Sequence, residues 1–180
     1  MKKIIALIVV CIMMFSFTGC EKKDDGNTLD VFYLNIDATA TVPEKYELKS
    51  SDESVDKQVD ELLDKLSSKP DDSKLRKTIP DDVEIRKHEE NAYSCTIDFS
   101  KSYYDMTAAE EVLMRASVVR TLTQLEQITY VMFTVDKAPL MNSDGEIIGS
   151  MNADDFVENP GEQINSSVKE TLTLFFADKE

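Results

Sequence analysis

Few residues in this chain are of types and spacings that could do chemistry together. The only histidine is His88, so a zinc site of several histidines is excluded, and a Ser-His-Asp triad would have to use this residue. No serine lies in a Gly-x-Ser-x-Gly turn, and the glycines form no phosphate-binding loop. We expect His88 at the surface. The sequence thus predicts no catalytic residue and no metal or cofactor site.

Three pairs of adjacent acids are the other candidates for catalysis. They are Asp71-Asp72, Asp81-Asp82 and Asp154-Asp155, all in segments predicted as loops. Cleavage of a glycan needs two carboxyl groups that face each other across a cleft, one of them with a raised pKa. Neighbouring acids in polar loops do not meet this description. We expect solvated loop ends and helix caps, and a protein that is not an enzyme.

Cys20 is the residue with the clearest predicted chemistry. Two lysines open the chain, a run of 15 uncharged residues (4–18) follows, and Gly19-Cys20 ends the segment. This order is typical of a signal peptide, and the segment resembles those of bacterial lipoproteins. The resemblance implies cleavage after residue 19 and a diacylglyceryl group on the thiol of Cys20. Residues 20–27 would then form the lipid anchor and a short tether on the extracytoplasmic face of the cell membrane.

An ordinary transmembrane anchor, or a cleaved signal with an incidental cysteine, is the alternative. The apolar run is shorter than the roughly 17–25 residues that cross a bilayer, which favours the lipoprotein. Cleavage would remove Lys2 and Lys3, so the mature chain would keep 18 of the 20 basic residues and all 35 acidic ones, a net charge of −17. Such a chain repels nucleic acid. Cys11 is lost with the signal, which leaves Cys95 without a disulfide partner.

Hydrophobic periodicity predicts both helices and strands. Residues 29–36 are apolar at nearly every position, as in a strand covered on both faces. Cys95 shares one face of a predicted strand with Ile97 and Phe99, so we expect a buried thiol. Thr107 and Glu110 form a capping box at the start of a helix. The predicted elements are strand 29–36, helix 54–67, loop 69–82, strands 83–87 and 93–99 joined by 89–91, helix 107–127, strand 128–135 and hairpin 140–148.

This order predicts an α+β fold, a mixed sheet with two helices on one face, followed by a hairpin and a further strand. Gly145 suits the positive φ of the hairpin turn. Tyr103 and Tyr104 are expected as a lid over the edge of the core, with an exposed aromatic binding surface as the alternative. The final residues 171–180 align with 28–37, either as the start of a second copy of the domain or as an extra edge strand.

Several segments taken in order resemble the GerM domain of bacterial sporulation and germination lipoproteins. They are Val31-Phe32-Tyr33-Leu34, Thr78 to Ile85, Thr96 to Lys101, Val119 to Gln124 and Val131 to Val135. The resemblance covers residues 28–158 and leaves 159–180 as linker and strand. It implies a non-enzymatic βαββαβ-type core similar to ring-building modules. Asp136 to Leu140 departs from the family, which tends to have glycine in this turn.

The resemblance implies an envelope scaffold that acts in sporulation or germination. Its expected partners are other envelope or sporulation proteins, or further copies of the chain. The alternative is a lipoprotein that binds the cell wall, including its peptidoglycan, or a small ligand, or that regulates a peptidoglycan hydrolase.

Overall fold

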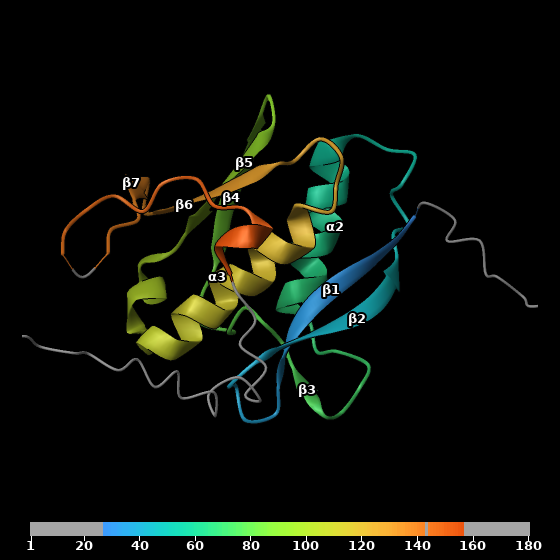
Figure 1. Cartoon of the computed structure of the whole chain (residues 1–180), viewed down its shortest axis with the longest axis horizontal. Coiled ribbons are helices and arrows are strands. Elements are labelled where there is room, and N and C mark those ends of the chain that lie inside the picture. Colours follow the sequence, from blue (N-terminus) through green and yellow to red (C-terminus); the bar gives the residue numbers. More distant parts are fainter. Residues whose placement is uncertain (1–26, 143, 157–180) are drawn as a thin grey trace, which may run out of the picture.

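The computed structural model describes residues 27–142 and 144–156. It confirms the α+β fold (Figure 1). The helices and strands follow one another as β1 (Thr28–Asn35), β2 (Thr41–Glu47), α2 (Val55–Ser67), β3 (Leu75–Arg76), β4 (Ile85–Asn91), β5 (Ser94–Phe99), η1 (Lys101–Asp105), α3 (Ala108–Leu122), β6 (Tyr130–Val135), β7 (Ala138–Pro139) and η2 (Ala153–Asp155). Neither helix is long and apolar enough, within this part of the chain, to cross a membrane.

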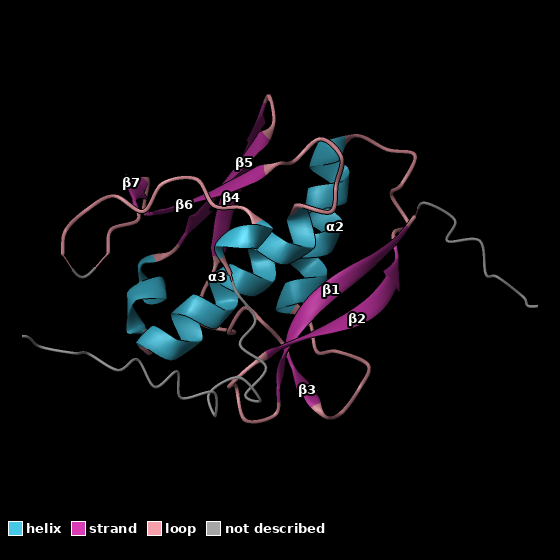
Figure 2. Cartoon of the chain, viewed as in Figure 1, coloured by secondary structure: helices cyan, strands magenta, loops and turns pink. Residues whose placement is uncertain are grey.

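The strands form two sheets and not the single mixed sheet that the sequence predicted (Figure 2). In the first sheet, β1 lies between β2 and β3 and is antiparallel to both. The second has the order β4-β5-β6-β7, with β5 and β6 parallel and linked through α3. Both helices lie against β1, α2 also contacts β4, and α3 also contacts β6. The two sheets therefore share one hydrophobic core with the helices.

On the side away from β2, β3 pairs only with the last two residues of β1, and side chains satisfy the backbone along the rest of this free edge. Gln124 accepts from the amide of Asp30 at 2.8 Å and donates to its carbonyl at 2.7 Å. Thr121 accepts from the amide of Phe32 at 3.0 Å, and Thr78 donates to the Phe32 carbonyl at 2.8 Å. Buried backbone amides and carbonyls need hydrogen-bond partners, and here side chains supply them in place of another strand.

The same geometry explains a proline within β2. Pro43 pairs with Phe32 in the β1–β2 register. Because the Phe32 backbone groups point away from β2, the pair exchanges no hydrogen bonds, and the missing N–H of Pro43 falls on the outer edge. As predicted, β1 is covered on both faces. The hydroxyl of Tyr33 reaches the carbonyl of Lys65 in α2, and Arg120 of α3 lies 4.3 Å from the ring centre of Phe32.

The helices begin where the sequence predicted, but α3 ends earlier. The capping box of Thr107 and Glu110 is present. The helix was expected to continue to residue 127 and stops at Leu122. Thr123 and Gln124 explain the difference, because their side chains donate back to the carbonyls of Val119 and Arg120. These bonds satisfy carbonyls at the helix end and turn Gln124 toward β1.

Two predicted connections also differ in detail. Residues 89–91 belong to β4, and the turn to β5 is Ala92 and Tyr93, with Ala92 at a φ of 54°. The predicted loop 69–82 contains β3, which pairs with the end of β1. Gly145 has the expected positive φ, 79°, between the bridged residues Met141 and Ile147. The strand predicted within 171–180 lies outside the described residues.

The turn that departs from the family pattern is tight and has no glycine. Asp136 and Lys137 join β6 to β7 with φ of 52° and 68°. Such turns favour glycine or asparagine. Here the carboxylate of Asp98 accepts from the Lys137 amide at 2.8 Å, and Arg86 and Lys101 form ion pairs with Asp136. These contacts hold a conformation that the two side chains disfavour.

Candidate functional site

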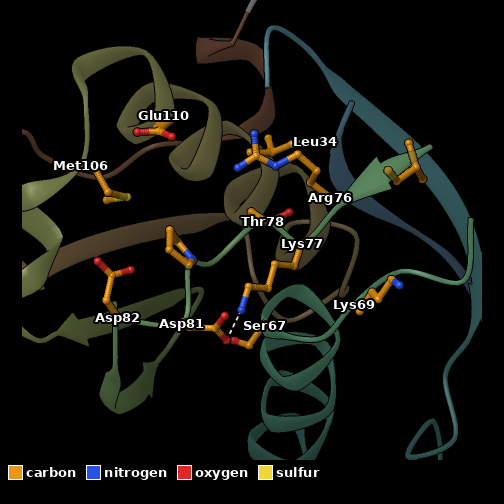
Figure 3. A pocket seen from close by; sticks show the side chains of 12 residues that line it. Leu34, Ser67, Lys69, Arg76, Lys77, Thr78, Asp81, Asp82, Met106 and Glu110 are labelled. Carbon is orange, nitrogen blue, oxygen red and sulfur yellow. Dashed lines mark ion pairs between the residues drawn. The ribbon is translucent and has the colours of Figure 1, made fainter. Parts of the chain in front are cut away.

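A groove of about 780 Å³ opens where β3 meets the end of α2 and the start of α3 (Figure 3). Twelve residues line it, from the end of β1, the end of α2, the segment 75–82 and the start of α3. They are Leu34, Ser67, Lys69, Leu75, Arg76, Lys77, Thr78, Pro80, Asp81, Asp82, Met106 and Glu110. Segments far apart in the sequence thus build one surface.

Pairing and hydrogen bonds fix the segment that forms the groove. Arg76 of β3 pairs with Leu34 of β1. The carbonyl of Leu66, near the end of α2, accepts from the amides of Thr78 and Ile79, both at 3.0 Å. Thr78 and Ile79 are buried. The segment is therefore anchored from both sides, and its charged side chains project from a rigid base.

The charges in this groove are mixed, in a chain whose net charge is −15. Lys69, Arg76 and Lys77 bring three positive groups to it. Lys77 forms an ion pair with Asp81, as Figure 3 shows. Glu110 lies on the opposite wall, and its pKa is lowered by hydrogen bonds from Thr107 and by the charge of Arg76. Mixed charges beside apolar side chains suit a protein surface with complementary charges.

His88 does not lie at the surface as the sequence predicted. Its side chain is only 11% exposed and sits between two carboxylates. Nε2 lies 2.8 Å from Asp60 of α2, and Nδ1 lies 2.7 Å from Glu90 of β4. Burial lowers the pKa of His88, but the hydrogen bonds to Asp60 and Glu90 outweigh it, so the pKa is raised overall.

Cys95 is fully buried beside this histidine, as predicted. Burial and the charge of Glu90 raise the pKa of its thiol to about 12. The ligand atoms of His88, Glu90 and Cys95 all lie within 4.8 Å of one another. Strand alternation could have revealed this group, because His88 and Glu90 share a face of the hairpin and Cys95 lies opposite Glu90. The position of Asp60 could not be predicted in this way.

The remaining predicted residues behave as structural or surface groups. The three acid pairs are exposed, and Asp155 caps the short helix η2 through the Asn152 amide. Tyr103 is buried and Tyr104 is 59% exposed, so Tyr103 alone belongs to the expected lid over the core. The hydroxyl of Tyr103 donates to Glu111. Cys20, the predicted lipid attachment site, lies outside the described residues.

Solved structures share this fold. The first GerMN domain of the sporulation protein GerM from Bacillus subtilis matches with a TM-score of 0.56 and 17% identity, over 72% of this chain and 98% of that one. The tandem GerMN domains of the same protein give the same TM-score and identity. This chain covers about half, 47%, of the length of that tandem structure. A search of curated proteins found no match.

A sequence comparison assigns the family. The model of the Germane family, described as "Sporulation and spore germination", matches residues 30–141. The matched region includes β1 from Asp30 onward and the side chains that satisfy its free edge, Thr78, Thr121 and Gln124. It also includes all twelve groove-lining residues and the His88 group. The chain belongs to the Germane family of sporulation and spore germination domains.

Proposed function

We propose that this chain is a lipid-anchored, non-enzymatic scaffold that binds protein partners at the extracytoplasmic face of the membrane during sporulation or germination. The observation that carries the proposal is the family match over residues 30–141. In this account residues 1–19 are the signal peptide, 20–27 the anchor and tether, 28–158 the domain, and 159–180 a linker and strand.

The anchor limits where the domain can act. Seven residues between Cys20 and the first strand span at most about 25 Å. The domain would therefore stay close to the bilayer, within reach of membrane proteins. Replacement of the thiol tests this part of the proposal. We expect Cys20→Ala to abolish incorporation of labelled fatty acid and to move the chain from the membrane fraction to a soluble one, whereas Cys95→Ala should do neither.

The groove is the surface that best suits a partner. It places three positive groups beside three acidic ones in a strongly acidic chain, and complementary charge favours specific association. We expect a photocrosslinking residue in place of Arg76 to form a discrete adduct with a membrane or envelope protein in sporulating cells. The adduct should be lost on Lys77→Glu and kept on Lys57→Glu, which reverses an exposed charge on α2.

The same positive groups favour a second candidate, the binding of carboxylates in peptidoglycan. Retention of the purified chain on isolated peptidoglycan, with loss on Arg76→Glu, would support this candidate. An adduct with a protein, and no retention on the wall, would support the scaffold. If the photocrosslinker gave the same weak products at Arg76 and at Lys57, the groove would not be the partner site.

A further inference from the structure

Three side chains that can bind a metal meet on the inner face of the β4–β5 hairpin. His88 and Glu90 are two residues apart on β4, so they point to the same face. Cys95 lies directly opposite Glu90 in the register. One nitrogen, one carboxylate oxygen and one sulfur therefore converge from two adjacent strands, with all three within 4.8 Å of one another.

Asp60 orients the histidine for such a role. It lies on α2, 28 positions away in sequence, and its carboxylate is 2.8 Å from Nε2 of His88. While Nε2–H donates to Asp60, Nδ1 faces Glu90 at 2.7 Å, and loss of the proton between them leaves the Nδ1 lone pair for an ion. Histidine ligands of metals nearly always donate their other N–H to a carboxylate or carbonyl, which fixes the ring and its tautomer. The Asp60–His88 pair has this arrangement.

The burial of these three side chains suits a bound ion. Cys95 is fully buried, the His88 side chain is 11% exposed, and the Glu90 side chain is 25% exposed. The group is thus enclosed on the side of the core and open on the side of Glu90, where an ion and a water could enter. Thiolate, imidazole and carboxylate are together the ligands that Zn²⁺ binds, commonly as three protein ligands with a water in the fourth position.

We propose that His88, Glu90 and Cys95 bind one Zn²⁺ ion through Nδ1, a carboxylate oxygen and Sγ, with Asp60 as the positioning residue. Binding displaces the thiol proton and the proton between Nδ1 and Glu90, and both are released to solvent. The site would join the hairpin to α2 and would be separate from the groove. It does not depend on the scaffold role.

Cobalt(II) is the direct probe, because it occupies zinc sites and reports its ligands by absorption. The whole chain, purified in detergent and stripped with a chelator, is titrated with Co²⁺. We expect one equivalent to give d–d bands of a tetrahedral ion and a thiolate-to-cobalt charge-transfer band, and Zn²⁺ to abolish both. Cys95→Ala should remove the charge-transfer band even though Cys20 remains.

Variants at the other positions test the remaining ligands. Asp60→Asn should weaken Zn²⁺ binding about 10–100-fold, the usual cost of losing an outer partner. His88→Gln and Glu90→Gln should weaken it further. Glu89→Gln is the matched control, because it removes the same charge from the neighbouring position, on the opposite face of β4, and should leave binding unchanged. Circular dichroism shows whether each variant is folded, and Glu90→Gln keeps the size of a partly exposed side chain.

The proposal fails if the wild-type chain binds no Co²⁺, or binds it without the charge-transfer band. It also fails if Glu90→Gln and Glu89→Gln bind Zn²⁺ equally well, which would mean adventitious binding to an acidic surface. In either case His88 is simply a histidine held between two carboxylates. A rise in the melting temperature of the wild-type chain with Zn²⁺, absent in folded His88→Gln, would support the site independently.

Discussion

The two helices are joined to the first sheet in chemically different ways. At the α3–β1 contact, the neutral side chains of Thr121 and Gln124 bind the backbone of β1. At the α2–β2 contact, the carboxylate of Glu61 accepts from the hydroxyl of Tyr46 and from the amides of Lys49 and Ser50, at 2.9 and 2.8 Å. The hydrogen bonds to the β1 backbone are neutral, and those of Glu61 depend on the charge of a carboxylate.

The difference predicts that the two contacts respond differently to mutation and to pH. Loss of a neutral partner leaves a backbone group without a hydrogen bond at any pH. Loss of the Glu61 charge by protonation weakens only the second contact, and only in acid. The neutral contact also involves segments that resemble the GerM domain, because Thr121 and Gln124 bind the strand that contains Val31 to Leu34.

The largest effect is expected from Gln124→Leu. This change leaves both the amide and the carbonyl of Asp30 without their partner. We expect a loss of about 2–3 kcal/mol in the free energy of unfolding, measured by urea unfolding of the purified chain. Gln127→Leu makes the same replacement at an exposed position and should cost much less. Equal losses of unfolding free energy in the two variants would show that the hydrogen bonds of Gln124 to β1 do not stabilise the fold.

Thr121→Val should have a smaller effect on the same contact. Valine keeps the shape of the side chain but leaves the buried amide of Phe32 without an acceptor. We expect a loss of about 1–2 kcal/mol at neutral pH and at pH 4 alike. Thr123→Val is the control, because that hydroxyl only donates back to a carbonyl of its own helix. A loss that varied with pH would contradict a neutral contact.

Acid should weaken the α2–β2 contact. Burial opposes the charge of Glu61, but hydrogen bonds from Ser50, Tyr46 and the Lys49 amide outweigh it and lower its pKa from 4.5 to about 2. A lowered pKa stabilises the fold above pH 4.5, and this contribution is lost as the pH falls toward 2. We expect a loss of about 1–2 kcal/mol after solvent screening is allowed for.

The pH dependence of urea unfolding measures this loss. Glu61→Gln should flatten the profile between pH 4.5 and 2, whereas Glu126→Gln, at an exposed position, should leave the wild-type slope. Gln124→Leu should lower the whole profile without changing its slope. If Glu61→Gln kept the slope, another carboxylate would be responsible for it.

The smallest effect is expected from Asp60→Asn in the presence of a chelator. Asp60 has a lowered pKa through hydrogen bonds from His88 and Lys57, yet its side chain is 46% exposed. Exposed ion pairs contribute little, so we expect a loss of about 0.5 kcal/mol or less in urea unfolding. A loss as large as that of Thr121→Val would mean that the contact between α2 and β4 is stronger than its exposure suggests.

Local patterns predicted much of the fold. The buried strand β1, the amphipathic helix α2, the capping box of α3 and the buried face of β5 with Cys95 all depend on residues close in sequence. The features that were missed depend on distant ones. The two-residue strand β3 exists through pairing with β1, and beyond the end of α3 the Gln124 side chain binds Asp30, 94 positions away.

The candidate sites were predicted less well for the same reason. His88 has charged neighbours and was expected at the surface, but Asp60 on α2 covers it. The groove combines the ends of two helices with β3, and no single segment of the sequence contains it. Hydrophobic periodicity indicates which residues are buried within one element, and it does not indicate which polar side chains of different elements will meet.

One experiment tests the central claim, that this domain acts in sporulation or germination from a lipid anchor. In the producing organism, the yield of heat-resistant spores and their germination are measured for wild type, a gene deletion and Cys20→Ala at equal protein level. We predict that the deletion impairs spore formation or germination and that Cys20→Ala, lost from the membrane fraction, reproduces the defect. Normal spores from the deletion strain, or full function of Cys20→Ala away from the membrane, would contradict the account.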